Sequence, residues 1–430
     1  MSTAASAVTG RDPRYDEIFD LIAYAKALGV DLIENPHPMM EAARAKGPVQ
    51  PGTLAEVLGV ADDGIGKLFL VDRPHFTALG FDAVDTVLRD NELYSSAIYY
   101  EFYPFKQLGK SILHLGGAEH RHYRGVVQSL FTRRNVIDWW QTRWIEQMVD
   151  ELLGTLETRG RADLNQEFCA RLPMHTITRA FGLPSEDALD FRCNLLLGLD
   201  ARISPAERAG ADDIVNGVLR KAVLARRGVP GDDIISRLLA AEFVDEDGTS
   251  RVLSEAEIAD FCKVIVLAGG GTTWRQLGIT LVCLLSDPAQ FEAVKQDRRL
   301  IDAAINEALR WQNSTPLLYR LTTQDAVLGG VRIPAGSVVE YSTAAANRDP
   351  ARWTDPDRYD LFRAPQRHLA FAAGPHTCLG MFVALAEMRI AIDALIDRLP
   401  DLHFDPAFEA PRVTGTLGMR GASHLNVLYG

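Results

Sequence analysis

Apolar residues recur at helical spacing along most of the chain, and this pattern predicts a mainly α-helical protein. Helices are expected over residues 14–28, 36–46, 74–89, 118–131, 133–158, 163–181, 185–240, 299–311 and 378–398. Strand patterns are shorter: a β-hairpin over 53–72 that turns near Asp62, several strands over 318–341, and strand character over 401–428. The predicted fold class is therefore α+β, mainly α with small β-sheets.

One segment is apolar on most faces and predicts a long, buried helix. Ser254 and Glu257 form the pattern of a capping box, and the apolar run then continues to Ser286. At 1.5 Å per residue, such a helix is roughly 48 Å long and crosses the whole domain. Three glycines, Gly269–Gly271, interrupt it, each at a cost of about 1 kcal/mol relative to alanine. They favour a loop between two shorter helices, or tight helix packing, over a helix that opens toward a ligand.

Charge and composition exclude several classes of protein. The 57 acidic residues exceed the 45 basic ones, so the net charge is −12 at pH 7. We therefore expect no nucleic acid and no membrane as partner, although a local basic patch can dock an acidic protein. Without repeats or Gly/Ser-rich linkers, residues 1–430 are expected to form a single domain, with 1–35 as N-terminal extension and first helix. Five scattered cysteines without a CxxC motif and an N-terminus without an apolar core predict a cytoplasmic protein.

The strongest local signal is the segment Phe371-Ala-Ala-Gly-Pro-His-Thr-Cys-Leu-Gly380. Cys378 follows a Gly/Pro loop and opens a helix, a position that lowers the thiol pKa. The thiolate is then either a nucleophile, with His376 as its base, or a metal ligand. A haem iron needs N–H donors to the sulfur and an apolar shield; Phe371 offers the shield, and Gly380 leaves room for a flat macrocycle. A buried structural cysteine is the remaining interpretation.

This segment resembles the cysteine-ligand loop of the cytochrome P450 family, F-G-x-G-x-H-x-C-x-G, except that Ala372 replaces a glycine. Glu307-Ala-Leu-Arg310 resembles the family's E-x-x-R, in which both side chains share one helix face. Pro356-Asp-Arg358-Tyr resembles the segment that supplies a second arginine. The resemblance implies a buried ion-pair group of Glu307, Arg310 and Arg358 that anchors the cysteine loop, with His368 as the alternative to Arg358.

The segment Ala268-Gly-Gly-Gly-Thr-Thr273 resembles the family's A-G-x-D/E-T-T/S motif in the distal helix. The resemblance implies a catalytic Thr272 beside bound dioxygen, flanked by Gly271 and Thr273. The alternative is a helical threonine that bonds back to the preceding turn. Since Gly271 stands in the place of the family's acid, we expect protons to arrive through water or through a carboxylate from elsewhere.

The cofactor that the resemblance implies is haem b, with Cys378 as the ligand of the metal. Its two propionates need cationic or N–H partners. The resemblance assigns them to His120, Arg124, Arg320 and His376, and places Ala268, Phe371 and Gly380 beside the macrocycle. The substrate pocket is expected to be apolar, with the candidates Tyr99, Phe102, Leu113, Val264, Leu267, Ala268, Thr315, Leu317 and Met419.

The resemblance implies a monooxygenase that uses O2 to hydroxylate a small-to-medium hydrophobic substrate. We expect electrons from separate proteins, a ferredoxin and its reductase or a similar donor, because the sequence contains no flavin, nicotinamide or iron–sulfur segment. Arg363, Arg367 and Arg389 are expected to offer the donor positive charge. Two alternatives stay open: a haem-thiolate enzyme that uses peroxide or reduces a small ligand, and a haem-dependent binding or sensing protein.

Overall fold

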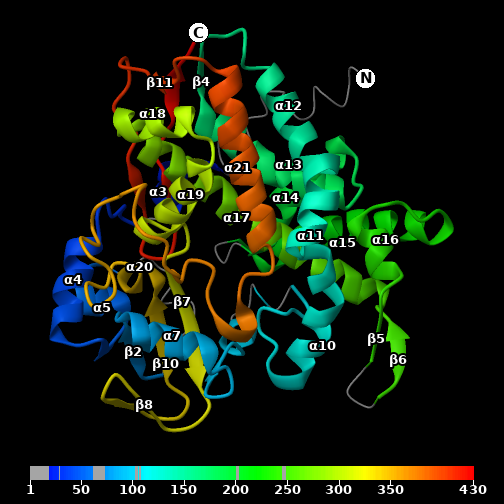
Figure 1. Ribbon diagram of the computed structural model, residues 1–430. Coiled ribbons are helices and arrows are strands. Elements are labelled where there is room, and N and C mark those ends of the chain that lie inside the picture. Colours follow the sequence, from blue (N-terminus) through cyan, green and yellow to red (C-terminus); the bar gives the residue numbers. More distant parts are fainter. Residues whose placement is uncertain are drawn as a thin grey trace.

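The computed structural model describes residues 19–28, 30–61, 73–101, 105, 108–199, 203–244 and 248–430. Helices form most of it, and the small sheets lie toward its edges (Figure 1). The predicted class, mainly α with small β-sheets, is confirmed. Phe102 and residues 62–72, which belong to the sequence predictions, lie outside the described residues.

The helices follow the predicted order, with several long predictions divided into shorter pieces. The first half of the chain forms α3 (Leu21–Leu28), α4 (His37–Lys46), α5 (Leu54–Leu58), α7 (Phe81–Arg89), α8 (Ile98–Glu101), α10 (Gly117–Gln128), α11 (Arg133–Asn135), the π-helices η2 (Val136–Ile145) and η3 (Asn165–Cys169), α12 (Glu146–Gly154) and α13 (Arg171–Ala180). The second half forms α14 (Ser185–Leu199), α15 (Pro205–Gly228), α16 (Ile234–Leu239), α17 (Glu255–Leu285), α18 (Pro288–Gln296), α19 (Leu300–Trp311), α20 (Thr343–Ala346) and α21 (Met381–Arg398).

The long central helix is α17, and it is continuous over 31 residues. Ser254 caps it as predicted, because its hydroxyl accepts the Glu257 N–H while Glu257 accepts the Ser254 N–H at 2.8 Å. A Cβ atom on Gly269 would lie 2.6 Å from Ile177 Cδ1 on α13, and one on Gly270 would lie 1.9 Å from Arg192 Nη1 on α14. Gly269 and Gly270 therefore serve tight helix packing, and the alternative of a loop between two helices is wrong.

The largest sheet in the described part of the chain has five strands in the order β1-β2-β10-β7-β3. The central pair, β2 (His75–Ala78) and β10 (Val338–Ser342), is parallel, and the other neighbours are antiparallel. The outer strands are β1 (Val49–Pro51), β7 (Leu317–Thr322) and β3 (Tyr94–Ser95). Smaller sheets pair β4 (Arg161–Asp163) and β11 (His403–Phe404) with β14 (Asn426–Leu428), β5 (Glu242–Val244) with β6 (Ser250–Val252), β8 (Ala326–Leu328) with β9 (Val331–Ile333), and β12 (Val413–Gly415) with β13 (Arg420–Ala422).

Two predictions near the N-terminus are wrong. The start of the predicted hairpin at 53–72 is the helix α5, which Thr53 and Glu56 open with a capping box. The first part of the helix predicted over 74–89 is strand β2, and α7 begins only at Phe81. β2 pairs with strands on both sides and three of its four residues are buried, so it lacks the alternation that marks a half-exposed strand.

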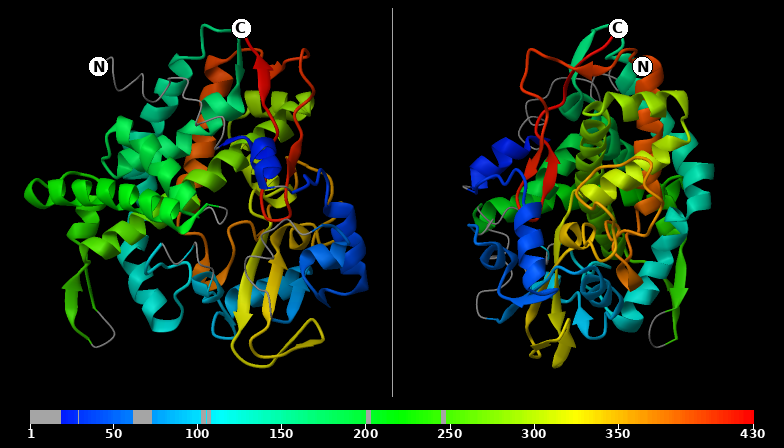
Figure 2. Two further views of the ribbon diagram at one scale, coloured as in Figure 1. Left: turned by 180° about the vertical axis from the view of Figure 1, so that it is seen from behind. Right: turned by 60° about the vertical axis from the view of Figure 1, so that its left-hand side comes forward.

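The N-terminal segment packs on the C-terminal hairpin, and Figure 2 shows α3 beside the strands near the end of the chain. The link is Arg420 on β13, whose guanidinium donates to the carbonyls of Ile33 and Glu34 and to those of Gly415 (3.1 Å) and Val413 (3.2 Å). The Arg420 side chain is almost wholly buried. One arginine therefore joins residues almost 400 positions apart.

Among the described residues, no single helix combines the length and apolar composition needed to cross a membrane. α17 and α18 meet those criteria only as a pair, with a bend of 104° between them.

Candidate functional site

The cysteine loop is held by close backbone contacts. Gly374 adopts a left-handed conformation (φ +70°), and a Cβ atom there would lie 2.6 Å from the carbonyl oxygen of Leu88 at the end of α7. Cys378 N–H donates to the Phe371 carbonyl at 2.9 Å, which closes the loop. The Cys378 sulfur accepts the backbone N–H groups of Gly380 and Met381. These contacts fix the sulfur at the N-terminus of α21, three residues before the helix begins.

Ala372, the departure from the family pattern, has a positive φ of 59°. Residues other than glycine adopt this conformation at a cost of about 1–2 kcal/mol, because Cβ approaches the following carbonyl. The loop keeps its turn, since Ala372 N–H donates to the Leu369 carbonyl at 3.0 Å. The alanine therefore strains the loop without opening it.

The Cys378 thiol does not have the lowered pKa that the sequence predicted. Although part of the Cys378 surface is exposed, the protein around its sulfur desolvates the thiol and raises its pKa, and this effect exceeds the opposing effects of the two N–H donors and of the Arg124 charge. The nucleophile hypothesis also lacks a base, because burial and the charge of Arg320 lower the pKa of His376 to about 2. The arrangement fits a metal ligand, whose deprotonation the metal itself drives.

The predicted ion pair between Glu307 and Arg310 is present on α19 and is buried. Arg310 donates from Nη2 to Glu307 Oε1 at 2.7 Å and from Nε to Oε2 at 2.8 Å. Its other N–H groups donate to the carbonyls of Asn347 (3.1 Å), Pro356 (2.8 Å) and Arg358 (3.0 Å). A bidentate pair with further hydrogen bonds is the arrangement in which buried charges are satisfied. It ties α19 to the irregular segment that leads to the cysteine loop.

The second arginine of this group is Arg363, and the prediction of Arg358 is wrong. Arg363 Nε donates to Glu307 Oε1 at 3.0 Å, whereas Arg358 contributes its backbone carbonyl. The alternative His368 lies 3.4 Å from Asn306, and burial lowers its pKa to about 4. The sequence resembles the family pattern around Pro356, but the backbone turns at Asp360, whose N–H donates to Glu307 Oε1. The arginine side chain that reaches Glu307 is therefore that of Arg363, seven positions after Pro356.

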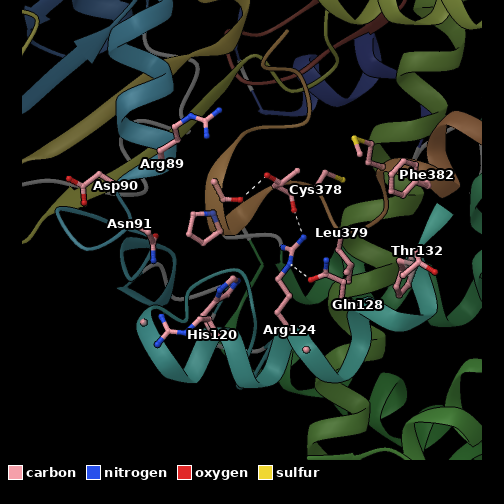
Figure 3. A pocket seen from close by; sticks show the side chains of 18 of the residues that line it. Arg89, Asp90, Asn91, His120, Arg124, Gln128, Thr132, Cys378, Leu379 and Phe382 are labelled. Carbon is pink, nitrogen blue, oxygen red and sulfur yellow. Dashed lines mark hydrogen bonds between the residues drawn. The ribbon is translucent and has the colours of Figure 1, made fainter. Parts of the chain in front are cut away.

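The four residues predicted to hold propionates come from α10, β7 and the cysteine loop. The rings of His120 and His376 lie 4.1 Å apart, and Arg124 and Arg320 both act electrostatically on these rings. Arg124 also donates to the carbonyl of Thr377, next to Cys378, and to Gln128 at 3.3 Å (Figure 3). Arg320 donates to the carbonyl of Tyr319 at 2.9 Å. The structure thus brings all four together beside the cysteine loop.

This cluster has the properties of an anion site. Burial and the charges of Arg124, Arg121 and Arg320 lower the pKa of His120 to about 4. His120 Nε2 is buried without a hydrogen-bond partner. Buried polar atoms usually have partners, so the chemistry of these residues fits the two carboxylates of a haem.

On the distal side, α17 carries the predicted Ala268–Thr273 segment. Ala268 is exposed in the middle of a mostly buried helix, so it faces open space, whereas Thr273 is buried. Thr272 is half-buried, and its hydroxyl donates to the Ala268 carbonyl at 2.7 Å. The hydroxyl oxygen keeps its lone pairs, and Gly271 supplies no side chain beside it. A Cβ on Gly271 would meet Arg275 Nη1 only at 3.7 Å, which is ordinary contact.

The predicted substrate residues other than Phe102 and Ala268 lie in four separate places. Leu113, Val264 and Leu267 lie in one apolar cluster together with Leu379 and Phe382, which follow Cys378. Leu317 packs in a second cluster with Tyr99, whose hydroxyl accepts the Tyr319 N–H at 3.1 Å. Tyr99 therefore anchors its segment. Thr315 has a buried hydroxyl without a partner, and Met419 packs against the cluster around Phe19 and Trp274.

A hollow of about 1010 Å³ lies between α10, the end of α7 and the cysteine loop, and it includes Cys378 (Figure 3). Four arginines line it: Arg89, Arg121, Arg124 and Arg133. The arginines predicted to give this side its charge are already neutralised, since Arg363 pairs with Glu307, Arg367 with Asp85, and Arg389 with Asp302. Sequence reasoning missed Arg121 and Arg133, although both lie near the His120/Arg124 motif.

Comparisons with known proteins agree with this geometry. The cytochrome P450 family model matches residues 218–404. The chain is 32% identical to the cytochrome P450 monooxygenase PikC of Streptomyces venezuelae over 389 residues, 88% of this chain and 87% of PikC. It is 34% identical to cytochrome P450 107B1 of Saccharopolyspora erythraea over 324 residues, 75% of this chain and 78% of that protein.

Solved structures show the same fold. CYP109E1 from Bacillus megaterium in complex with testosterone has a TM-score of 0.78 and 27% identity, covering 92% of this chain and 99% of CYP109E1. P450BioI in complex with a fatty-acid-ligated acyl carrier protein has a TM-score of 0.77 and 26% identity, covering 92% and 99%. With this fold, this degree of identity and a cysteine held at the N-terminus of α21, the chain belongs to the cytochrome P450 family, whose members are haem b-containing oxidoreductases.

Proposed function

We propose that the protein is a monooxygenase that hydroxylates a hydrophobic substrate with O2, drawing electrons from a separate donor protein. The observation that carries the proposal is the Cys378 sulfur, which accepts two backbone N–H groups beside a buried cationic cluster. Haem b bound there supplies the chemistry that activates O2. We further propose a single cytoplasmic domain.

In this proposal Cys378 is the iron ligand. The N–H groups of Gly380 and Met381 stabilise negative charge on its sulfur. Phe371 and Gly380 would lie beside the macrocycle, and Phe371 packs against the apolar core that surrounds α21. The Glu307, Arg310 and Arg363 group ties α19 to the segment that precedes the cysteine loop and so helps to fix the position of the sulfur.

His120, Arg124, Arg320 and His376 bind the propionates. His120 offers the unpartnered Nε2, and the two arginines supply charge. Arg124 has a second function, because its guanidinium donates to the Thr377 carbonyl beside the sulfur. The negative charge of the propionates would offset the cost of holding the positive charges of Arg124 and Arg320 close together.

Thr272 is the distal hydroxyl. Because its proton is donated to the Ala268 carbonyl, the oxygen is available as an acceptor and can hold a water on the open side of α17. Gly271 and Thr273 supply no acid. Protons therefore reach the site through water, and this relay is weaker than one that contains a carboxylate.

The substrate lies near Leu113, Val264, Leu267 and Ala268, with Thr315 and Leu317 at the side of β7. This wall is apolar, and the Thr315 hydroxyl is an orienting group without a partner of its own. A neutral hydrophobic compound fits better than an ionised one. The relative CYP109E1, solved with testosterone, is consistent with this class.

The electron donor docks at the hollow beside the cysteine loop. Two of its arginines, Arg121 and Arg133, favour an acidic protein such as a ferredoxin that is served by its own reductase, whereas Arg89 is paired with Asp85 and Arg124 is assigned to the propionates. This replaces the docking face expected around Arg363, Arg367 and Arg389, whose charges are paired within the chain.

The test combines a spectrum with turnover. The reduced, carbon monoxide-treated protein should give the long-wavelength Soret band of thiolate-bound iron. With generic ferredoxin and reductase, hydrophobic compounds that shift the spin state should be hydroxylated with consumption of O2. A Soret band typical of histidine-bound iron would exclude the Cys378 ligand, and spectral binding without product would favour a binding or sensing protein.

One alternative rests on a specific observation, the missing acid at Gly271. It is a haem-thiolate enzyme that uses peroxide or reduces a small ligand, reactions that do not depend on the same proton relay. Product formed with hydrogen peroxide alone, at a rate above that with O2 and the donor proteins, would support this alternative over the monooxygenase.

A further inference from the structure

The loop from Leu108 to Leu115, which joins the apolar cluster of Leu113, Val264 and Leu267, has an unusual contact at its start. Gly109 has a left-handed backbone (φ +66°). A Cβ atom on it would lie 2.0 Å from Asp260 Oδ2 and 2.3 Å from Oδ1. The carboxyl group of Asp260, on α17, therefore occupies the volume in which any other residue would place its side chain.

The same carboxyl group binds the next residue of the loop. Lys110 N–H donates to Asp260 Oδ2 at 3.0 Å. The Lys110 side chain turns the other way, forms an ion pair with Glu119 on α10 at 2.5 Å, and lies 4.5 Å above the ring of Tyr123. The start of the loop is thus fixed by its backbone to α17 and by its side chain to α10.

The far end of the loop is fixed to the opposite side of the site. Ser96 Oγ donates to the Leu115 carbonyl at 3.1 Å, and the His376 ring, two residues before Cys378, bonds to the backbone of Ile112. Between these attachments Leu108, Ile112 and Leu115 are buried in the cluster that also contains Val264. The loop therefore bridges α17 and the cysteine loop, along one wall of the proposed pocket.

We propose that Asp260 is a positioning residue for the Leu108–Leu115 loop. By accepting the Lys110 N–H and filling the space beside Gly109, its carboxyl group holds this loop closed over the substrate pocket and sets the rate at which ligands enter. The inference rests on the proposed function in one respect, namely that the space beneath the loop is the substrate pocket. The contact itself depends on a side-chain oxygen at 260 that accepts a hydrogen bond, on a residue without a side chain at 109 and on a backbone N–H at 110.

The charges around Asp260 make this contact sensitive to pH. On α17, Lys263 Nζ lies 3.7 Å from Asp260 Oδ1 and Glu257 lies one turn away; the loop faces the carboxyl with the Lys110 N–H. The positive charge of Lys263 also acts on the carboxyl group of Asp212 on α15. Burial outweighs the favourable contacts and raises the pKa of Asp260 from 3.8 to about 6.

Protonation of Asp260 and closure of the loop are thermodynamically linked. When the loop lifts, Asp260 becomes hydrated and its pKa returns toward the ordinary value, so the closed state binds more protons between pH 4 and 6. Lowering the pH therefore favours the closed loop, and raising it through 6 favours opening. At neutral pH the carboxylate holds the loop by its hydrogen bond while its own burial opposes closure.

The experiment measures opening in two independent ways on the full-length protein. Hydrogen–deuterium exchange of the amides of residues 109–115, corrected for intrinsic rates, reports the loop itself. Rebinding of carbon monoxide to the reduced, haem-loaded protein after a flash reports entry of a ligand that does not titrate. The variants are Asp260→Ala, Asp260→Asn and Gly109→Ala, with Gly217→Ala on α15 and Asp138→Asn on η2 as matched controls, because a Cβ on Gly217 meets nothing within 4 Å and Asp138 forms an exposed pair with Arg134.

Asp260→Ala and Gly109→Ala should speed exchange of the Lys110 amide by roughly 10- to 100-fold, the factor for one lost hydrogen bond to a charged group. Both should also speed entry of carbon monoxide. Asp260→Asn keeps the acceptor and should abolish the rise in entry rate that the wild type shows between pH 5 and 7. The controls should match the wild type.

Unchanged exchange at 109–115 in Asp260→Ala would overturn the positioning role of Asp260. The same pH dependence in the wild type and Asp260→Asn would overturn its role in entry. Should the haem-loaded protein lack the thiolate spectrum, the proposed function fails, yet the exchange measurement still decides whether Asp260 holds the loop.

Discussion

The two sides of the proposed haem site are built by different means. On the proximal side, Glu307 accepts hydrogen bonds from two arginines, and the cysteine loop is closed by backbone contacts that leave little freedom. On the distal side, one helix presents Thr272 with Gly271 beside it, and a nearby loop is attached to this helix through the Asp260 carboxyl group. The comparison teaches that the chain holds the metal ligand rigidly and leaves access and proton delivery to a few adjustable contacts.

The largest effect is expected at the sulfur. Cys378→Ala removes the proposed iron ligand, so the thiolate Soret band and O2-dependent turnover should both be lost. The control is Cys283→Ala, because Cys283 is buried in the last turn of α17 and burial raises the pKa of its thiol to about 12. Retention of the thiolate spectrum in Cys378→Ala would disprove the assignment.

The next effect tests how rigid the proximal side is. Glu307→Gln leaves two buried arginines without their shared carboxylate and should lower the free energy of unfolding by about 3–5 kcal/mol. Asp302→Asn, on the same helix, breaks only the exposed pair with Arg389 and should change it by at most about 1 kcal/mol. Denaturant unfolding followed by circular dichroism measures both, and equal losses would contradict the buried group.

A related pair of variants separates the two arginines. Arg363→Met should approach Glu307→Gln in effect, since Arg363 Nε contacts Glu307 directly. Arg358→Met should be mild, because only the Arg358 carbonyl belongs to the group and the substitution leaves it in place. A larger loss for Arg358→Met in the same unfolding experiment would restore the sequence-based assignment.

The distal side should respond in rate more than in stability. Gly271→Glu places a carboxylate beside Thr272, and the open space around its Cβ accommodates the new side chain. The rate of O2-dependent turnover should rise, at most by the roughly 10²- to 10⁴-fold that a positioned acid provides. Gly271→Gln is the control for side-chain size. No difference between the two variants would mean that another route already delivers protons.

The smallest effect concerns the strained loop residue. Ala372→Gly relieves the positive φ of 59° but adds freedom to the unfolded chain, so a net gain of at most about 1 kcal/mol is expected. The midpoint of thermal unfolding should rise, while Ala373→Gly, without a positive φ to relieve, should lower it. A lower midpoint for Ala372→Gly would show that the methyl group is packed favourably.

The extent to which sequence predicted this molecule follows the same division. Cys378, Glu307 and Arg310 were predicted because their chemistry depends on short spacings along one loop or one helix turn. Arg363 was missed because an irregular segment decides which arginine reaches Glu307. The capping box of α5 is absent from the prediction, although Thr53 and Glu56 show the same kind of pattern as Ser254 and Glu257, which correctly predicts the start of α17.

Other features depend on contacts between distant segments, which periodicity does not report. The seat of Asp260 against Gly109 joins positions 151 residues apart, and neither residue stands out in its own neighbourhood. Strand β2 was taken for helix because it lies inside a sheet and shows no alternation. The pKa of Cys378 was misjudged because the helix N-terminus is visible in sequence, whereas burial is not.

Arg420 donates hydrogen bonds to four carbonyl groups, and this arrangement limits how the N-terminal segment of the chain can be shortened. Residues 33–34 supply two of them, so a truncation that removes this segment leaves a buried guanidinium with only Val413 and Gly415. The hairpin β12–β13 would then loosen, and Met419, at its tip, would shift. A shortened N-terminus, chosen to simplify expression or to fuse a reductase, is therefore also a change to the packing around Phe19 and Trp274.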